Sequence, residues 1–597
     1  MMVYADDIAC LLTSPADLDR LHSHLQVYSA ASNALVNFHK TEAISLSGSA
    51  TNYDSICWHD ATSPSPIRYL GFPLFTSIRQ RNSFLEQLVD KIRIGCQIHK
   101  HRGLSVRGRA TVLNSLVLSR LWHVLRLVTV PVSILNSIQS MISQFVNYRI
   151  SPKISHLTFL ASRSKGGLGV LNPKLQQGAL QLRWLEPLLN MSSTQIMSHL
   201  SIALPRLVGF LGAHISNNRN LPTDHPSQLF DHCISLFFPG LRPPTCNQQD
   251  SSWSLLFRAM DRIPLDFSST VISAATSLEI PLASVVLSVS PNTKFRKSYD
   301  KLPISIAYTM DPTLDHCLRP KSSQEILSNP NLATSFLRFV RQDQIQLAPF
   351  FVRTFIHRRF AGLGRFPFSP VENHRVVDAS PFVQAVLSSL SPTSRVRQHR
   401  LSTKSYRKLC SPSSNPPPSL PPPYNPSTRP AWSAFWALPL SHSCRNVWYR
   451  FLYHRIPHRV RLYEWERAPS PSCAICHHPT ESTDHFMFSC PVKLAVWQQV
   501  HHEHLGAEAF ITSLDLHHLL TILRSPHVRS TSDLCIIAAT LESIWLSHWS
   551  FIFNDTPFTT DIVLALVAQK IRQHKQESFL TAGIPHSPPP FFSIDPL

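Results

Sequence analysis

Four residues in the C-terminal part of the chain have the types and the spacing of a metal site. Three thiolates and one imidazole follow the pattern Cys473-x2-Cys476-x8-His485-x4-Cys490. Such a set closes a tetrahedral shell around Zn²⁺ with protein ligands alone. We therefore expect a structural zinc, because no open position remains for a substrate or a catalytic water.

The close cysteine pair predicts a knuckle turn, which the histidine and the last cysteine complete from the following turn. His477 and His478 lie beside Cys476 and compete with His485 as the nitrogen ligand. The other cysteines among the 12 of the chain are spread thinly. This distribution indicates a reducing compartment, nuclear or cytoplasmic, with one metal site and no disulfide framework.

A pair of carboxylates, Asp6 and Asp7, lies between two short apolar runs. This pattern predicts a tight β-hairpin with the acids at its tip. Adjacent carboxylates repel each other and are tolerated best beside a bound cation. In two-metal phosphoryl transfer such groups hold Mg²⁺, so we expect the pair to be magnesium ligands. Acids at this position also argue against a signal peptide. The chain has no run of about 20 uncharged apolar residues, the pattern that would predict a membrane span.

The charge of the chain is strongly basic, with 56 Lys and Arg against 36 Asp and Glu, a net charge of +20. From Lys91 to Leu185 there is no acidic residue, whereas 14 residues are Lys or Arg. A one-sided run of this kind favours a polyanionic partner, which we expect to be nucleic acid. No motif for a small-molecule cofactor accompanies it.

The N-terminal motif resembles a known family. Tyr4-Ala5-Asp6-Asp7, followed by an apolar run, resembles the Tyr-x-Asp-Asp box of reverse transcriptases, and its alanine resembles the non-LTR (LINE-type) retrotransposon branch. The stretch Leu35–Glu42 resembles the next palm motif, which implies that Lys40 acts as general acid toward the pyrophosphate leaving group. Arg68–Leu74 resembles the primer-grip hairpin. Ser14 followed by Pro15 and Asp17 predicts a helix start between these motifs.

The resemblance also implies what an active site would need. In the family a further palm aspartate and the fingers precede the Tyr-x-Asp-Asp box, and three residues precede Tyr4 here. We therefore expect Mg²⁺ binding only if the site is completed, and no polymerisation by the chain as written.

The basic segment resembles the thumb of LINE-type enzymes. Leu104–Arg109 resembles its first residues, and a predicted helix follows with an apolar face of Leu113, Leu116, Val117, Leu121, Val124 and Leu127. Arg120 falls on this face, where it either lays its stem on apolar surface or reaches a phosphate. Lys165–Val170 lacks the ending of a phosphate loop and resembles the Gly-Gly-Leu-Gly turn after the thumb. The implied contacts to an RNA template and to RNA–DNA or DNA duplex are Arg102, Arg107, Arg109, Arg120 and Lys165.

The C-terminal half adds two patterns. Aromatic residues alternate with arginines between Trp432 and Arg461, which is typical of base stacking but also of a helical core, the interpretation we favour. The cysteine and histidine spacing resembles the zinc-binding domain of LINE-type reverse transcriptases.

Together these features predict an α+β chain: a partial palm of β-hairpins and a helix, then a mostly helical thumb and C-terminal region with a small zinc knuckle. The expected divisions are 1–80 palm, 81–190 thumb, 191–410 helical with no assigned role, 411–430 Pro-rich linker, 431–500 zinc-binding domain and 501–597 C-terminal helices. We expect a fragment of an RNA-directed DNA polymerase. The alternatives are a non-enzymatic zinc-dependent RNA- or DNA-binding protein and the product of a decayed element.

Overall fold

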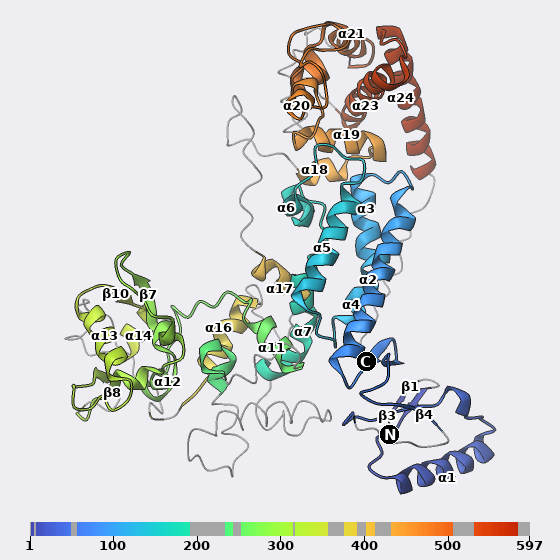
Figure 1. Ribbon diagram of the computed structural model, residues 1–597. Helices are drawn as coiled ribbons and strands as arrows, with labels where there is room; N and C mark the ends of the chain where they lie inside the picture. Colours follow the sequence, from blue (N-terminus) through green and yellow to red (C-terminus); the bar gives the residue numbers. More distant parts are fainter. Residues whose placement is uncertain are drawn as a thin grey trace. The chain divides into compact units, whose positions relative to one another are not determined.

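The computed structural model describes residues 2–4, 7–48, 56–190, 233–242, 252–313, 317–355, 375, 377–390, 402–411, 432–505 and 530–582 (Figure 1). The chain divides into two compact units, Met1–Leu88 and Val89–Leu597, each of which is described by itself. Short two-stranded sheets and many helices make up the described part, a composition compatible with the predicted α+β class. The predicted Pro-rich linker lies outside the described residues, apart from Ser411.

The first unit contains three short sheets, one complete α-helix, a short 3-10 helix and the first residues of the helix that begins at Ile78. The N-terminal strands form an antiparallel hairpin, in which Tyr4 lies opposite Asp7. Ser14 caps the helix and Asp17 completes a capping box, as the sequence predicts. Leu70 and Gly71 both have positive φ, which suits the two-residue turn of the last hairpin. The elements are β1 (Met2–Tyr4), β2 (Asp7–Ala9), α1 (Pro15–Ser32), η1 (Phe38–Lys40), β3 (Glu42–Ile44) parallel to β4 (Cys57–His59), β5 (Ile67–Tyr69) and β6 (Phe72–Leu74).

Residues 89–190, here called the thumb-like segment, are helical. The predicted apolar face is partly wrong: Leu113, Val117, Leu121 and Val124 are buried, but Leu116 and Leu127 are 55% and 46% exposed. A π-helical turn, which contains Leu116, interrupts the helix and adds a residue, which rotates the later helical positions around the axis. Leu127 lies beyond the last helical residue, Val124. The elements are α2 (Ile78–Lys100), α3 (Val106–Val112), η2 (Leu113–Val117), α4 (Ser119–Val124), α5 (Val132–Val146), α6 (His156–Leu160), η3 (Arg163–Lys165) and α7 (Pro173–Asn190).

The region between the thumb-like segment and the linker was expected to be helical, and it also contains two antiparallel strand pairs. A continuous apolar core runs from Ala179 on α7 to Tyr406 on α17. Its elements are η4 (Cys233–Leu236), η5 (Pro239–Leu241), α11 (Ser252–Met260), α12 (Ala274–Glu279), η7 (Leu282–Val285), β7 (Val286–Val289) paired with β10 (Ile345–Leu347), η8 (Lys297–Asp300), η9 (Ile304–Ile306), β8 (Tyr308–Met310) paired with β9 (Leu318–Pro320), α13 (Pro330–Arg341), α14 (Pro349–Phe355), α16 (Ser380–Leu390) and α17 (Thr403–Cys410).

Residues 432–505 and 530–582, here called the C-terminal bundle, pack as one body. The helices after position 500 pack against α19, η10 and α21, which precede it. The residues on the two sides of position 500 therefore belong to one packed body. The elements are α18 (Trp432–Ala437), α19 (His442–Leu452), α20 (Arg459–Glu464), η10 (His485–Ser489), α21 (Pro491–Val500), η11 (His501–Leu505), α23 (Thr531–Asn554) and α24 (Thr560–Ala582).

One helix of the C-terminal bundle, α23, is long and apolar enough to cross a membrane by length and composition alone. Half of its most apolar window is buried inside the structure, as in the core helix of a folded domain. Glu542 in this helix is buried and pairs with Lys570 of α24 at 3.0 Å. Phe553, near the C-terminal end of α23, is 74% exposed.

Candidate metal centre

The first two candidate ligands lie on a tight turn. The amide of His477 donates to the carbonyl of Cys473, and the amide of Cys473 donates to the carbonyl of His478. His477 has a φ of 59°, the left-handed conformation that allows the chain to reverse. These bonds form the knuckle that the close cysteine pair predicts, and they direct both thiols toward the same side.

The other two candidate ligands come from the ends of a single π-helical turn, η10. His485 begins this turn, and Cys490 follows it at the N-cap of α21. The amide of Cys490 donates to the carbonyl of His485, which closes the turn. Pro491 is at the first position of α21, where its missing amide hydrogen costs nothing.

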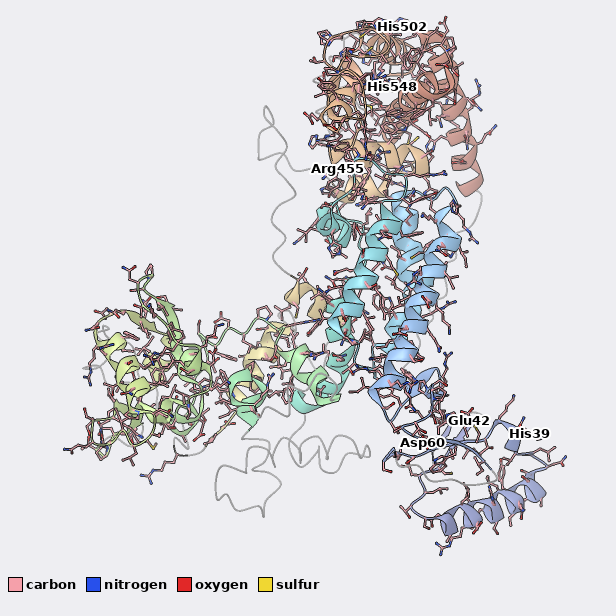
Figure 2. All side chains as sticks on the ribbon, viewed as in Figure 1. His39, Glu42, Asp60, Arg455, His502 and His548 are labelled. Carbon is pink, nitrogen blue, oxygen red and sulfur yellow. The ribbon has the colours of Figure 1, made fainter. Side chains whose placement is uncertain are left out.

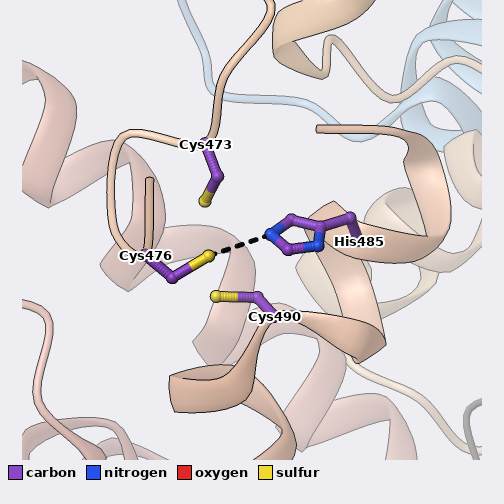
Figure 3. A group of neighbouring side chains, drawn as sticks. All are labelled: Cys473, Cys476, His485 and Cys490. Carbon is purple, nitrogen blue, oxygen red and sulfur yellow. Dashed lines mark hydrogen bonds between the residues drawn. The ribbon is translucent and has the colours of Figure 1, made fainter. Parts of the chain in front are cut away.

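The four ligand atoms converge (Figure 3). One atom from each of Cys473, Cys476, His485 and Cys490 lies within 4.8 Å of the others, and Nε2 of His485 is 3.2 Å from Sγ of Cys476. Sulfur ligands at about 2.3 Å from a tetrahedral zinc are separated by about 3.8 Å, so small movements would fit the set around the ion. Three of the four residues are buried, which suits a closed structural site.

The structure separates the three histidines that the sequence left as alternatives. His485 contributes its Nε2 to the convergent group. The ring of His478 stacks on that of His485 at 4.7 Å, and its Nδ1 lies 3.0 Å from the carbonyl of Thr480. His477 has its own side chain outside the group of convergent ligand atoms. The nitrogen ligand that this arrangement supports is therefore His485.

Hydrogen bonding with the Cys490 thiol holds the pKa of Cys473 well below its ordinary value. Such a pair shares a proton between two sulfurs, and a metal would replace that proton because zinc binds thiolates. The N-terminus of α21 stabilises negative charge at Cys490 as well. The donor set and its surroundings thus fit Zn²⁺.

A carboxyl group that the sequence did not single out supports the knuckle. Glu481 is fully buried, and its Oε1 accepts a hydrogen bond from the amide of Arg459 at 3.0 Å. Its backbone carbonyl accepts from the amide of Val460, and its amide donates to Pro471. Burial raises the pKa of Glu481 to about 7. Glu481 therefore ties the zinc loop to α20 at both its main chain and its side chain.

A buried lysine supports the other side. Nζ of Lys493 donates to the carbonyl of Phe486 at 2.7 Å and lies 4.3 Å from the centre of the Phe486 ring. Burial lowers the pKa of Lys493. Its neighbour His548 on α23 lies among the C-terminal helices (Figure 2). The residues that follow the last ligand are thus fixed by polar contacts inside the core.

Comparison with known proteins agrees with this centre. The family model for the zinc-binding domain in reverse transcriptase matches residues 422–497, which include all four ligands. This chain carries a reverse-transcriptase zinc-binding domain. The predicted resemblance to the C-terminal part of a non-LTR retrotransposon reverse transcriptase is thereby confirmed.

One curated relative is a transposon protein, the Transposon TX1 uncharacterized 149 kDa protein of Xenopus laevis. It is 28% identical over 193 residues, which cover 31% of this chain and 14% of the relative. The chain therefore matches about a seventh of the relative's length. Together with the zinc-binding domain, this match makes the chain a product related to retrotransposon reverse transcriptases.

Outside the zinc-binding domain, the predicted catalytic residues are described only in part. The backbone of Asp7 pairs with Tyr4 in the predicted hairpin, whereas Asp6 and the Asp7 side chain lie outside what the structure describes. Lys40 ends the short η1 helix and is exposed. The roles of these three residues stay predictions.

The predicted nucleic-acid contacts occupy different environments. Arg102, Arg120 and Lys165 are exposed, and Arg120 thus lies off the buried face because of the π-helical turn. Arg107 is half-buried. Arg109 donates to the carbonyls of Leu104, Val146 and Tyr148, at 3.0, 2.8 and 2.6 Å. This guanidinium joins α3 to the end of α5, a structural task that the sequence did not predict.

Proposed function

We propose that this chain is part of a non-LTR retrotransposon reverse transcriptase that binds RNA template and RNA–DNA or DNA duplex, with a structural zinc in its zinc-binding domain. The convergence of Cys473, Cys476, His485 and Cys490 carries the zinc part of the proposal. The zinc would fix the knuckle against the C-terminal bundle, and the surrounding residues would hold its ligands in place. An intracellular location, nuclear or cytoplasmic, suits thiolate ligands.

The acid-free segment Lys91–Leu185 supports nucleic-acid binding. Arg102, Arg120 and Lys165 on this segment are exposed, as contacts to a phosphate backbone must be. Each basic residue that neutralises a phosphate releases counterions, so affinity depends on salt. If about five of the basic residues make contact, the slope of log affinity against log salt should be about −4 to −5 on duplex.

Fluorescence anisotropy with a labelled RNA–DNA duplex, measured over a series of salt concentrations, tests this binding. We expect Arg102→Gln together with Arg120→Gln to lower the slope by about 1.8. The matched control is Arg338→Gln together with Arg341→Gln on α13, which changes the net charge equally on exposed side chains. A wild-type affinity that does not depend on salt would refute the proposal.

The polymerase origin rests on the Tyr4–Asp7 hairpin, whose register supports the resemblance to the Tyr-x-Asp-Asp box. Asp6 and Asp7 are fewer carboxylates than a two-metal site uses in the family, so we expect Mg²⁺ only in a completed site. A primer-extension assay with Mg²⁺ and a primed RNA template checks this expectation. Extension that Asp6→Asn abolishes would show an active polymerase. Its absence beside salt-dependent binding would favour the alternative, a non-enzymatic zinc-dependent binding protein.

A further inference from the structure

The Gly-Gly-Leu-Gly turn of the thumb-like segment packs against the aromatic residues of the C-terminal bundle. The hydroxyl of Tyr449 donates to the carbonyl of Gly166 at 3.0 Å, and Nε1 of Trp436 donates to the carbonyl of Arg163 at 3.0 Å. Nη2 of Arg450 donates to the carbonyl of Ser151 at 2.7 Å. We call this contact region the junction. It joins residues nearly 300 positions apart in the sequence.

Packing at the junction is tight enough to require glycine. Gly166 has a φ of +86°, and a Cβ added there would lie 2.4 Å from Trp432 Cε2 and 2.5 Å from the Tyr453 hydroxyl. The rings of Trp432 and Tyr453 stack at 5.4 Å, so neither can move without disturbing the other. The two segments are therefore held in one relative position at this contact.

The two stretches of chain that meet at the junction are basic. Neither Lys91–Leu185 nor residues 432–463, the two stretches that meet here, contain an acidic residue. Burial, and after it the charge of Arg163, lowers the pKa of Arg107. Burial and the charge of Arg107 lower the pKa of Arg445 in the same way. These guanidiniums repel one another, and an anion beside them would relieve that repulsion.

Three of the junction arginines are committed to the protein backbone. Arg109, Arg445 and Arg450 each donate to main-chain carbonyls, and these bonds fix their positions. Arg107 and Arg163 differ, because neither side chain makes a hydrogen bond or an ion pair with another described residue. Arg163 is exposed and Arg107 is half-buried, so both guanidiniums reach solvent.

Trp436 contacts the side chain of Arg107 and the main chain of Arg163. The Arg107 guanidinium lies 5.8 Å from the centre of the Trp436 ring, and the indole nitrogen holds the Arg163 backbone. The ring also contacts Phe435 and Tyr449, with centres 4.9 and 5.4 Å away, and it is only partly buried. The two guanidiniums beside it have the chemistry that suits phosphate oxygens.

We propose that Arg107 and Arg163 bind the phosphate backbone of a nucleic-acid strand at the junction, so that the thumb-like segment and the zinc-binding domain act as one binding surface. This inference rests on the proposed nucleic-acid binding and adds its site. Contacts to phosphates alone carry no base information, so the site holds all sequences alike.

The test compares the full-length zinc-loaded protein with the double variant Arg107→Gln and Arg163→Gln on a labelled RNA–DNA duplex. Loss of two phosphate contacts should lower the salt slope by about 1.8, equally for duplexes of different sequence. The pair Arg338→Gln and Arg341→Gln on α13, with the same change of net charge, should leave the slope unchanged. The inference would be overturned if both double variants lowered the salt slope equally, or if the junction variant left the slope unchanged.

Gly166→Ala provides a second measurement that alters no charge. It should separate the junction and weaken duplex binding, and Arg163→Gln should then cost less in the Gly166→Ala background than in the wild type. Equal costs in the two backgrounds would show that Arg163 acts without the junction, which contradicts the inference. Displacement of the duplex by poly-glutamate at equal charge concentration would reassign the site to acidic protein segments.

The two proposals fail in different ways. If the wild type shows no salt-dependent binding, nucleic-acid binding itself is wrong. If the affinity of the wild type falls steeply with salt and the junction variants have the same slope, nucleic-acid binding stands and the junction site is wrong.

Discussion

Nζ of Lys493 lies 3.0 Å from Nδ1 of His548, although 55 positions separate the two residues in the sequence. Both side chains are buried, at 0% and 1% exposure. Lys493 is on α21, directly after the last zinc ligand, and His548 is on α23. The contact makes the zinc-binding domain and the C-terminal helices one folded body, so the metal should stabilise more of the chain than its own loop.

We expect about one Zn²⁺ per chain, and we expect Cys476→Ser to lose it. Because structural zinc contributes folding free energy directly, this variant should unfold the C-terminal bundle, including α23 and α24. Metal analysis and hydrogen exchange of the 530–582 peptides measure the two effects. Cys535→Ser is the matched control, since Cys535 is a buried cysteine of the same bundle outside the ligand set. Full zinc occupancy in Cys476→Ser would refute the ligand assignment.

The stability of the C-terminal bundle should depend on the protonation of His548. Burial, and after it the charge of Lys493, lowers the pKa of His548 well below its ordinary value of 6.5. Folded protein thus keeps this ring neutral while the unfolded chain takes up a proton, so stability is lost as the pH falls below about 6.5. The loss should approach about 1.4 kcal/mol per pH unit for this one group.

Denaturant unfolding of the zinc-loaded protein between pH 7 and pH 5, compared with His548→Gln, checks this prediction. Zinc release at low pH affects both proteins, and the difference between them isolates the histidine. The same pH dependence in the wild type and in His548→Gln would show that the ring is not responsible.

Gly166→Ala should destabilise the protein because of the tight packing of the junction. We expect a cost about 1–3 kcal/mol larger than that of Gly103→Ala. Gly103 also has a positive φ, +61°, but a Cβ added there would meet no atom within 4 Å. The control thus carries the backbone strain without the clash. Thermal unfolding measures the cost of both substitutions. Equal costs would mean that the aromatic residues around Gly166 can move aside at no cost in stability.

Substitution of Arg109 should lower stability, whereas substitution of Arg102 should lower nucleic-acid binding. Arg109→Met leaves three backbone carbonyls without their donor and should cost about 1–3 kcal/mol in the free energy of unfolding. Arg102→Gln changes an exposed side chain and should leave stability within about 0.5 kcal/mol, while it lowers the salt slope on duplex. Denaturant unfolding and anisotropy on both variants check this contrast. If Arg109→Met were as stable as the wild type but bound duplex more weakly, Arg109 would be a phosphate contact and not a structural residue.

Some features of this protein follow from short stretches of sequence. The hairpin that pairs Tyr4 with Asp7 and the capping box of α1 were predictable, because each depends on residues only a few positions apart. The zinc ligands belong here as well, since 18 positions hold all four and the chain between them is short enough to fix their meeting. The aromatic residues near Trp432 were expected to form a core, and Trp432, Phe435, Trp448 and Phe451 are buried.

Other features were decided only by the tertiary structure. Periodicity assumes an unbroken helix, so it could not foresee the π-helical turn at Leu113–Val117 that moves Arg120 and Leu116 to the exposed side. By charge alone, Arg107 and Arg109 were equivalent. In the structure Arg109 donates to three backbone carbonyls, whereas the Arg107 guanidinium lies over the ring of Trp436. The contact between Tyr449 and Gly166 spans 283 positions. Local spacing carries no information about such pairs, because packing between distant segments depends on how the whole chain buries its apolar surface.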